Sequence, residues 1–311
     1  MPEYWVHNLS PFLIEFWPGV GIRWYGLAYL AGLLIGYWLA LRWIARGSVP
    51  LSRNELQDFV LYCGLGMIIG GRVGYCLLYN FTGTLQNPLY IFQVWDGGMA
   101  SHGGMIGMLI GCLLYARKQG RSFLVLNDLV VATGTLGVGF GRLANFINGE
   151  LWGRTTSVPW AVIFPHSVPE PGHIPKEQAA EILAWQIAHA LPRHPSQLYA
   201  MMLEGFLIFA ILLPIHARHR RPGLTCAYFL LLYGCGRFIG EFFREPDLGQ
   251  PVFFGWLTKG QAYTLPMFAL GIALLIYVFR RPAQPDLYCA PPMTPATKTT
   301  PTSAATTTKK S

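Results

Sequence analysis

Charged residues are scarce in this sequence. Asp, Glu, Lys and Arg make up 12% of its 311 residues, whereas a soluble domain carries about 25%. Hydrophobic residues make up 52%, which leaves too little polar surface to keep a globule in solution. The same composition excludes a disordered chain and a coiled coil, because both are rich in charge. A mean hydropathy of +0.36 indicates a membrane protein instead.

Paired cysteines are lacking as well. The six cysteines form no C-x-x-C motif, and five of them lie inside apolar runs, where a thiol acts as a small hydrophobic side chain. Neither a disulfide framework nor a zinc site is predicted, and no metal or other cofactor is expected. The N-terminus has no basic region with a cleavage site, so no signal peptide is predicted. Its aromatic residues, interrupted by Pro11 and Pro18, favour a segment in the membrane interface.

Long apolar runs, by contrast, are abundant. A bilayer is spanned by about 20 apolar residues. The sequence therefore predicts about seven transmembrane helices, at residues 22–42, 58–79, 103–117, 125–147, 196–215, 224–243 and 261–279. The predicted fold class is an all-α polytopic membrane protein.

The net charge of +8 fits either nucleic-acid binding or a membrane location, and its distribution favours the membrane. Fourteen of the 23 Lys and Arg residues follow alternate predicted spans: Arg42, Arg46, Arg53, Arg117, Lys118, Arg121, Arg218, Arg220, Arg221, Arg280, Arg281, Lys298, Lys309 and Lys310. By the positive-inside rule this face is cytoplasmic, which puts the N-terminus outside and the C-terminus inside. No nucleic-acid partner is expected.

Two polar segments lie outside the predicted spans. Residues 148–195 are polar, contain several prolines and are long enough to form a small outer head. We expect this head to be an insertion in a membrane-embedded body of residues 1–281. Residues 282–311 are rich in Pro, Thr, Ala and Lys, a composition that cannot bury a core. A disordered cytoplasmic tail is predicted there.

A set of polar side chains within or beside the predicted spans lies toward the outer ends. They are Arg23, Tyr25, His102, Arg142, Glu204, Arg237 and Glu241. Ionisable residues in a membrane are costly and indicate function. Because five helices contribute, we expect one cavity that opens to the outer leaflet and the outer water.

Two segments carry the strongest polar patterns. Tyr233, Arg237 and Glu241 are spaced i, i+4, i+8 and form one stripe along the sixth predicted helix, although a structural ion pair explains this spacing equally well. Residues 141–154 place two arginines, two asparagines and a glutamate where a helix leaves the membrane. Capping a helix needs no such cluster, so residues 141–154 are a candidate binding site.

His102 lies within a glycine-rich segment, residues 97–104. Dense glycine lets a backbone or a ligand approach closely. A catalytic histidine and an incidental loop histidine are both compatible with this pattern.

With these motifs the sequence resembles the prolipoprotein diacylglyceryl transferase family of bacterial inner-membrane enzymes. The signature GRLANFINGELWGR at 141–154 matches the family pattern throughout. Further matches are RWYG at 23–26, GGRVGY at 70–75, GGMASHGG at 97–104, RHPSQLYAMMLEG at 193–205 and YGCGRFIGEFFREPD at 233–247. Only the tail departs from the family pattern.

The resemblance implies transfer of the diacylglyceryl group of phosphatidylglycerol to the lipobox cysteine of a preprolipoprotein signal peptide, with release of glycerol-1-phosphate. It implies a seven-helix body with a small periplasmic head and an active site that faces the periplasm. It also implies catalytic roles for Tyr25, His102, Arg142 and Arg237. The residues implied to bind substrate are Arg142, Asn145, Glu150, Gly153, Tyr233, Arg237 and Glu241.

The residue types suit this chemistry. A cysteine thiol needs a base or a nearby cation to become a nucleophile, and a departing phosphate is bound well by guanidinium groups. His102 is a candidate base at neutral pH. In the alternative, nearby arginines lower the thiol pKa, water takes the proton, and His102 only positions its loop.

Two other classes of function compete with a lipid transferase. An intramembrane protease needs a Ser/His pair, an Asp pair or a zinc motif inside its spans, and none is evident. A non-enzymatic lipid transporter with an outer-facing arginine pocket would also explain the cations. We expect a transporter to carry polar sites on both sides of the midplane, whereas here they concentrate on one.

Overall fold

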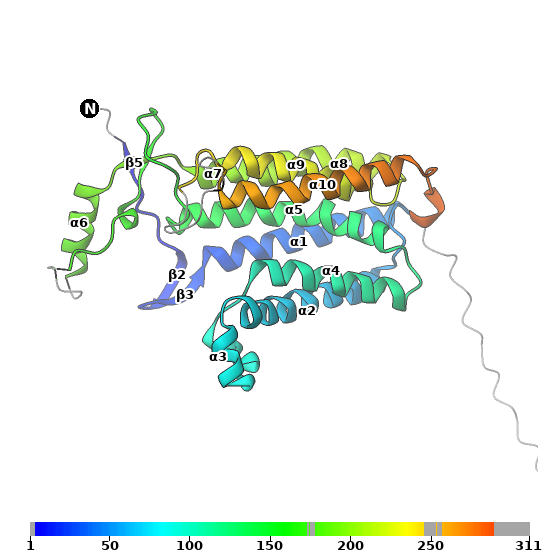
Figure 1. The fold of residues 1–311 in the computed structure, drawn as a ribbon, viewed down its shortest axis with the longest axis horizontal. Helices are drawn as coiled ribbons and strands as arrows, with labels where there is room; N and C mark the ends of the chain where they lie inside the picture. Colours follow the sequence, from blue (N-terminus) through cyan, green and yellow to red (C-terminus); the bar gives the residue numbers. More distant parts are fainter. Residues whose placement is uncertain (1–3, 173, 175–177, 246–252, 254–256, 289–311) are drawn as a thin grey trace, which may run out of the picture.

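The computed structural model describes residues 4–172, 174, 178–245, 253 and 257–288. Its long helices lie side by side in an elongated bundle, with a small mixed unit at one end and the C-terminal segment at the other (Figure 1). The bundle helices are α1 (Trp24–Ala45), α2 (Arg53–Leu78), α4 (Ser101–Lys118), α5 (Phe123–Ile147), α7 (Ser196–Ala200), the π-helical turn η4 (Met201–Phe206), α8 (Leu207–Arg218), α9 (Leu224–Gly240) and α10 (Lys259–Phe279).

Each of the seven predicted apolar runs is helical. Among the described residues, five helical stretches are long and apolar enough to cross a membrane: Trp24–Ala45, Arg53–Leu78, Phe123–Ile147, Ser196–Arg218 and Gly260–Phe279. Helix α9 is apolar but shorter. Large hydrophobic side chains such as Leu33, Ile69 and Leu270 are exposed on the bundle surface, where lipid rather than water suits them. The chain is therefore a multi-pass membrane protein, and the count of seven spans stays a prediction.

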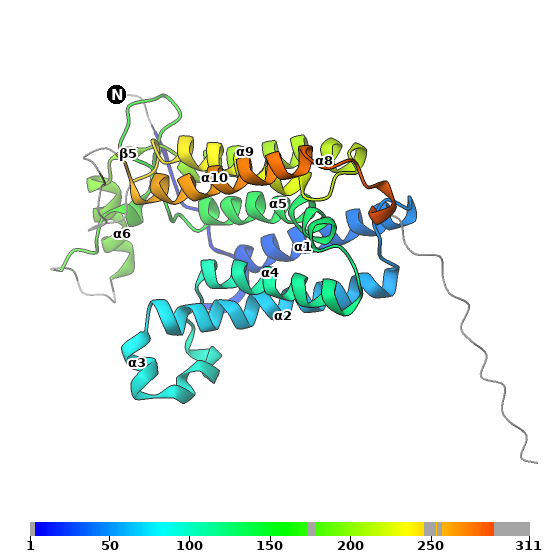
Figure 2. The same cartoon turned by 45° about the vertical axis from the view of Figure 1, so that its right-hand side comes forward.

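Glycines bring α2 and α4 into backbone contact. Gly66, Gly70 and Gly74 repeat every fourth residue on α2 and face Gly103, Gly107 and Gly111 of α4. A Cβ atom on Gly107 would lie 2.0 Å from the carbonyl oxygen of Gly66. This is the small-residue packing that associates helices within lipid. It gives the short glycine-rich α4 its place beside α2, and both views show the two helices as a pair (Figure 2).

The α2–α4 pair joins the rest of the bundle mainly at one end. A buried cluster there contains Trp43 of α1, Phe59 of α2, Tyr115 of α4 and Leu126 of α5. The Tyr115 hydroxyl donates to the backbone carbonyl of Glu55 at 2.8 Å. This end of the bundle is the one from which the C-terminal segment emerges (Figure 1).

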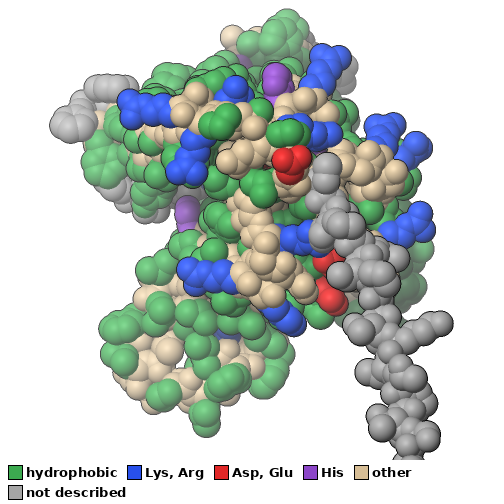
Figure 3. Space-filling model, turned by 90° about the vertical axis from the view of Figure 1, so that its right-hand side faces the viewer, with side chains coloured by type: hydrophobic (Ala, Val, Ile, Leu, Met, Phe, Trp, Pro, Cys, Tyr) green, Lys and Arg blue, Asp and Glu red, His purple; other side chains and the backbone are tan. Residues whose placement is uncertain are grey.

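The same end carries those described basic residues that follow alternate spans, such as Arg46, Arg121 and Arg281; Lys298, Lys309 and Lys310 lie outside the described residues. Lys and Arg side chains surround it in the space-filling view (Figure 3). The tail was expected to begin at residue 282, but residues 282–288 fold back onto the bundle and form the turn η5 (Pro285–Tyr288). Tyr288 is 2% exposed, and its hydroxyl donates to buried Asp128 at 3.2 Å. Residues 289–311 lie outside the described residues.

The unit at the opposite end mixes short strands with one helix. Strands β1 (Trp5–Val6), β4 (Val162–Ile163) and β5 (Pro192–Arg193) form a sheet in the order β1-β4-β5, beside helix α6 (Ala179–His189). The predicted head of residues 148–195 thus also takes in the N-terminal strand, because β1 supplies a parallel partner for β4.

A β-hairpin connects β1 to α1. Strands β2 (Phe12–Trp17) and β3 (Val20–Arg23) pair antiparallel and turn at Gly19, whose φ of +78° favours glycine. Most of the hairpin side chains are exposed and apolar, Phe16 and Trp17 among them. The segment predicted to lie in the interface therefore has extended structure, although the fold is predominantly helical as predicted.

Between α2 and α4 the chain makes an arm of short helices: α3 (Phe81–Gln86), η1 (Pro88–Phe92) and η2 (Val94–Asp96). Arg72 of α2, 2% exposed, organises this arm. Its guanidinium donates to the carbonyl oxygens of Tyr90, Ile91, Gln93, Gly97 and Gly98. The arm is thereby closed onto α2 just before His102.

Candidate functional site

Three elements approach one another closely near the head end of the bundle. A Cβ atom on Gly205 of η4 would lie 2.3 Å from the Cα of Gly139 in α5. A Cβ atom on Gly236 of α9 would lie 2.6 Å from the carbonyl oxygen of Leu203. Glycine at these positions lets the backbones touch. The contacts set Arg142, Glu204 and Arg237, each within three residues of one of these glycines, around one centre.

Glu204 is the acidic residue of this centre, and its side chain is fully buried. Its Oε2 atom accepts hydrogen bonds from the Nε and Nη2 atoms of Arg142 at 3.0 and 2.7 Å. Glu204 lies in the π-helical turn η4, an irregularity that is common at functional sites. A charge buried in this way is tolerated only when it is paired.

Arg237 of α9 is the second cation. It pairs with Glu241 at 2.8 Å, one helical turn further along, and its Nη1 atom lies 3.8 Å from Glu204. Glu241 packs against the first turn of α10, where a Cβ atom on Gly260 would lie 2.4 Å from its Oε1. The positive end of the α10 dipole favours a carboxylate there. In the predicted stripe of Tyr233, Arg237 and Glu241, the last two residues form an ion pair, and Glu241 also contacts α10.

Where α5 ends, a polar turn closes the centre on the head side. The Asn145 amide donates to the Glu150 carboxylate at 2.8 Å, and the Asn148 amide donates to the same oxygen at 3.3 Å. Leu151 follows with a φ of +57°, a conformation that non-glycine residues adopt at a cost and that clusters at functional sites. The Ser196 hydroxyl holds this turn through the carbonyl of Leu151 at 3.0 Å.

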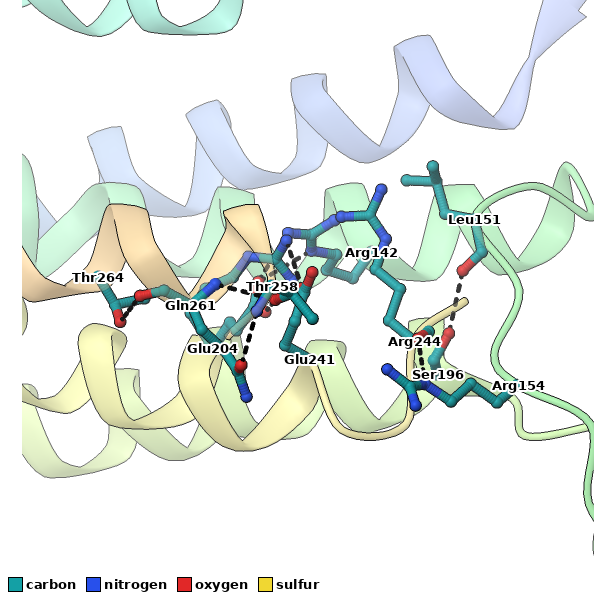
Figure 4. Close-up of polar contacts among 11 residues, drawn as sticks. Arg142, Leu151, Arg154, Ser196, Glu204, Glu241, Arg244, Thr258, Gln261 and Thr264 are labelled. Carbon is teal, nitrogen blue, oxygen red and sulfur yellow. Dashed lines mark hydrogen bonds and ion pairs between the residues drawn. The ribbon is translucent and has the colours of Figure 1, made fainter. Parts of the chain in front are cut away.

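One pocket lies at this centre, lined from α5, α7, η4 and α9 and from the turn after α5, and Figure 4 shows several of the side chains. Its lining consists of Arg142, Asn145, Leu151, Ser196, Gln197, Ala200, Glu204, Arg237, Gly240 and Arg244. Glu150 and Glu241, predicted to bind substrate, contact lining residues without lining the pocket. The polar lining residues Ser196, Gln197, Glu204 and Arg244 had no predicted catalytic or binding role, although Glu204 was expected to face the outer cavity. All four lie in the motifs 193–205 and 233–247, and Glu204 also stood out as a charge inside a span.

Two further predicted residues lie close by without lining the pocket. The Tyr233 hydroxyl interacts with the guanidinium of Arg142. Gly153 packs between backbone carbonyls, and a Cβ atom there would lie 2.5 Å from those of His194 and Phe243. Close packing alone therefore requires glycine at position 153, where a role in substrate binding was predicted.

Comparison with known proteins identifies the family. The model of the family described as prolipoprotein diacylglyceryl transferase matches residues 11–277. The chain belongs to this family.

Among similar curated proteins are the phosphatidylglycerol–prolipoprotein diacylglyceryl transferases of Yersinia enterocolitica, Vibrio parahaemolyticus and Vibrio cholerae. The Yersinia protein is 45% identical over 284 residues, which cover 89% of this chain and 96% of the relative. The first Vibrio protein is 42% identical over 274 residues, 88% of this chain and 92% of the relative. The second is 40% identical over 292 residues, 93% and 100% of the two chains. The chain is thus a transferase by family.

Two residues with catalytic roles implied by the resemblance do not line the arginine pocket. The Tyr25 hydroxyl lies 3.3 Å from that of Tyr29, which is close to Gly141 of α5. His102 lies at the start of α4 with its ring against Tyr263 of α10, 6.1 Å between centroids. Among the described residues, neither lines the pocket that holds Arg142 and Arg237.

Proposed function

We propose that this chain transfers the diacylglyceryl group of phosphatidylglycerol to the lipobox cysteine thiol of preprolipoproteins. The observation that carries the proposal is the pair of arginines, Arg142 and Arg237, which reach one pocket from two helices and share the buried carboxylate of Glu204. Two guanidinium groups fixed in this way suit a phosphate diester that becomes a phosphate monoester with more charge.

The proposed reaction uses this geometry. The thiolate sulfur of the peptide attacks the carbon of the diacylglycerol unit that is bonded to the phosphate oxygen. A carbon–sulfur bond forms, the carbon–oxygen bond breaks, and glycerol-1-phosphate leaves with the bonding electrons. Arg142 donates from its Nε and Nη2 atoms to Glu204 and also interacts with the Tyr233 hydroxyl, so its guanidinium is oriented before the phosphate binds. The thioether product stays in the membrane as the first intermediate of lipoprotein maturation.

The acceptor of the thiol proton depends on where the peptide binds. His102 and Tyr263 face each other between α4 and α10, outside the arginine pocket. His102 acts as the base if the lipobox thiol enters between these helices. His102→Gln is then slow near neutral pH and partly recovers as the pH approaches the thiol pKa of about 8.5. If His102 only positions its loop, the loss of activity is independent of pH.

We also propose the orientation of the chain in the bacterial inner membrane. The basic end (Figure 3) faces the cytoplasm, and the head of residues 148–195 with the arginine pocket faces the periplasm. The body extends to residue 288, because residues 282–288 pack against the bundle, and the cytoplasmic tail begins after it. Alkaline phosphatase fused after Gly172 is expected to be active and a fusion after Arg221 silent. The reverse pattern contradicts this orientation.

One assay separates the transferase from a transporter with the same arginine pocket. Membranes that contain the protein are incubated with acyl-labelled phosphatidylglycerol and a lipobox peptide. A label that remains on the peptide through a bond resistant to ester hydrolysis supports the transferase, because a transporter forms no covalent bond. A matched peptide with the lipobox cysteine replaced by serine is the control. Movement of labelled lipid between leaflets without peptide labelling supports the transporter instead.

A further inference from the structure

A second pocket lies at the basic end of the bundle, at the opposite end from the arginine pair described above. It has a volume of ≈ 140 Å³ and lies where the α4–α5 loop, the α8–α9 loop and the end of α10 meet. Its lining consists of Ser122, Leu124, Arg221, Pro222, Tyr277, Val278, Arg281, Pro282 and Gln284. No Asp or Glu is among these described residues, so the pocket is cationic.

The lining changes character along the bundle axis. Leu124, Tyr277 and Val278 belong to α5 and α10, near the ends of the apolar stretches. The cationic and polar members Arg221, Arg281 and Gln284 lie beyond the ends of these helices. A phospholipid has the same division between acyl chains and headgroup, whereas a free anion makes no favourable contact with the apolar side chains.

Among the described residues, Arg221 and Arg281 contact carbonyl groups and aromatic rings rather than acidic partners. The Nη1 atom of Arg221 donates to the backbone carbonyls of Arg281 at 2.6 Å and Val278 at 3.4 Å. Its guanidinium also lies 5.6 Å from the ring centroid of Phe279, and that of Arg281 lies 4.4 Å from the ring centroid of Tyr277. Carbonyls and rings orient a guanidinium without neutralising it, so each arginine keeps its charge for a ligand.

Ser122 adds a hydroxyl to the cationic side. It is the N-cap of α5, and its side chain makes no capping hydrogen bond. The amide N–H groups in the first turn of α5 point out of the N-terminal end of the helix, where Ser122 lies, and such groups favour an anion. Together with Arg221 and Arg281 the hydroxyl completes a set of donors for phosphate oxygens.

We propose that this pocket binds the phosphodiester headgroup of an anionic phospholipid, separately from the substrate lipid. Basic pockets between helices on the cytoplasmic side are suited to anionic headgroups. That the occupant comes from the cytoplasmic leaflet rests on the orientation given under the proposed function. The bound lipid ties together the ends of α5, α9 and α10.

The test uses the full chain in nanodiscs that contain photoreactive phosphatidylserine or photoreactive phosphatidylcholine. After illumination, labelled peptides that contain residues 122–124 and 277–284 are compared with peptides of the lipid-facing side of α1. The pocket peptides are expected to prefer the anionic lipid by about fivefold over the α1 peptides, since each nearby cation strengthens binding by about that factor. Equal labelling by the two lipids at the pocket overturns the proposal.

Neighbouring arginines provide a matched pair of variants. Arg281→Gln is expected to remove the preference, whereas Arg280→Gln keeps it, because Arg280 has the same charge but does not line the pocket. An equal loss in both variants means that only the general surface charge attracts the lipid, and this contradicts a site. Melting temperatures of both variants show that they are folded.

A further measurement with inorganic phosphate distinguishes a lipid headgroup from free phosphate as the ligand of this pocket. Inorganic phosphate is added at the ionic strength of a chloride control. If the pocket peptides show no lipid preference, while phosphate but not chloride raises the melting temperature of the wild type and not of Arg281→Gln, the pocket is a free-phosphate site and the lipid assignment is overturned. Labelling needs neither acyl transfer nor a fixed orientation of the chain. The transfer assay on Arg281→Gln therefore tests the proposed function separately.

Discussion

Arg142 and Glu204 come from different helices, yet the Nε and Nη2 atoms of Arg142 both donate to the Oε2 atom of Glu204, at 3.0 and 2.7 Å. This geometry fixes the plane of the guanidinium at the edge of the pocket. The second oxygen of Glu204 lies 3.8 Å from Arg237. One buried carboxylate thus orients both cations of the pocket.

Loss of the Glu204 charge is expected to abolish most transfer. In Glu204→Gln the two arginines lose their shared counter-ion, and removal of one partner of a buried pair costs about 3–5 kcal/mol. The measurements are transfer of labelled diacylglyceryl to a lipobox peptide and the melting temperature. Glu245→Gln is the matched control, because Glu245 forms an exposed pair with Arg193 and such pairs contribute little. Near-normal transfer by Glu204→Gln contradicts this role.

Lysine is not expected to replace either arginine. Arg142→Lys and Arg237→Lys keep the charge but lose the planar fork that binds two atoms at once. Loss of such a preorganised donor lowers the rate by about 100-fold or more. Insertion in the membrane should be normal, and Arg46→Lys on the basic end serves as a control. Substantial turnover with Lys at both sites means that charge alone is sufficient.

Arg72 is expected to control the order of the arm. Lysine cannot reach the five carbonyl groups that Arg72 binds, and each lost bond to a charged donor costs about 1.5–3 kcal/mol. In Arg72→Lys, hydrogen exchange of residues 88–98 should accelerate by about tenfold or more. Exchange in α5 serves as the internal reference. Unchanged protection of the arm shows that α2 packing alone holds it.

Two glycines of α2 and α4 should respond to alanine with opposite signs. Gly107→Ala puts a Cβ atom 2.0 Å from the carbonyl oxygen of Gly66, which forces the helices apart at a cost of about 1–3 kcal/mol. Gly64→Ala meets no atom within 4 Å, and alanine favours a helix by about 1 kcal/mol. Thermal unfolding in detergent measures both. A comparable loss in the two variants argues against backbone contact between these helices.

The attachment of the head to α5 should weaken in acid. The buried His7 ring interacts through Nε2 with the carbonyl of Phe146 at 2.7 Å, and burial lowers the pKa of His7, with His166 adding to the effect. A depressed pKa means that folding favours the neutral ring. The stabilisation of the folded state by neutral His7 is present above about pH 6.5 and is lost as the pH falls below that value.

Limited proteolysis of residues 4–10 measures this attachment. Cleavage in the wild type should increase between about pH 7.5 and about pH 5.5. In His7→Asn the pH dependence should be smaller, because no group at this position titrates. His189→Asn is the control, because this histidine is exposed on α6. An equal pH dependence in His7→Asn and the wild type assigns the effect to other groups.

The helices and the family could be predicted from the sequence because both depend on local patterns. Apolar runs long enough to span a bilayer fold as helices whatever their neighbours, and every predicted run is helical. Cationic residues after alternate runs gather at one end of the bundle (Figure 3). The signature at 141–154 contains Arg142 and Asn145, which line the pocket.

Only the tertiary structure decided which residues meet. Glu204 appeared in the sequence as one charge among several, and its pairing with Arg142 depends on the glycine contacts between α5 and η4. His102 and Tyr25 lie at the predicted end of the bundle but outside the arginine pocket, because the packing of α4 on α2 and of α1 on α5 sets their positions. Periodicity gives the depth and face of a side chain along its own helix. The approach of two helices depends on contacts between residues that are far apart in the sequence.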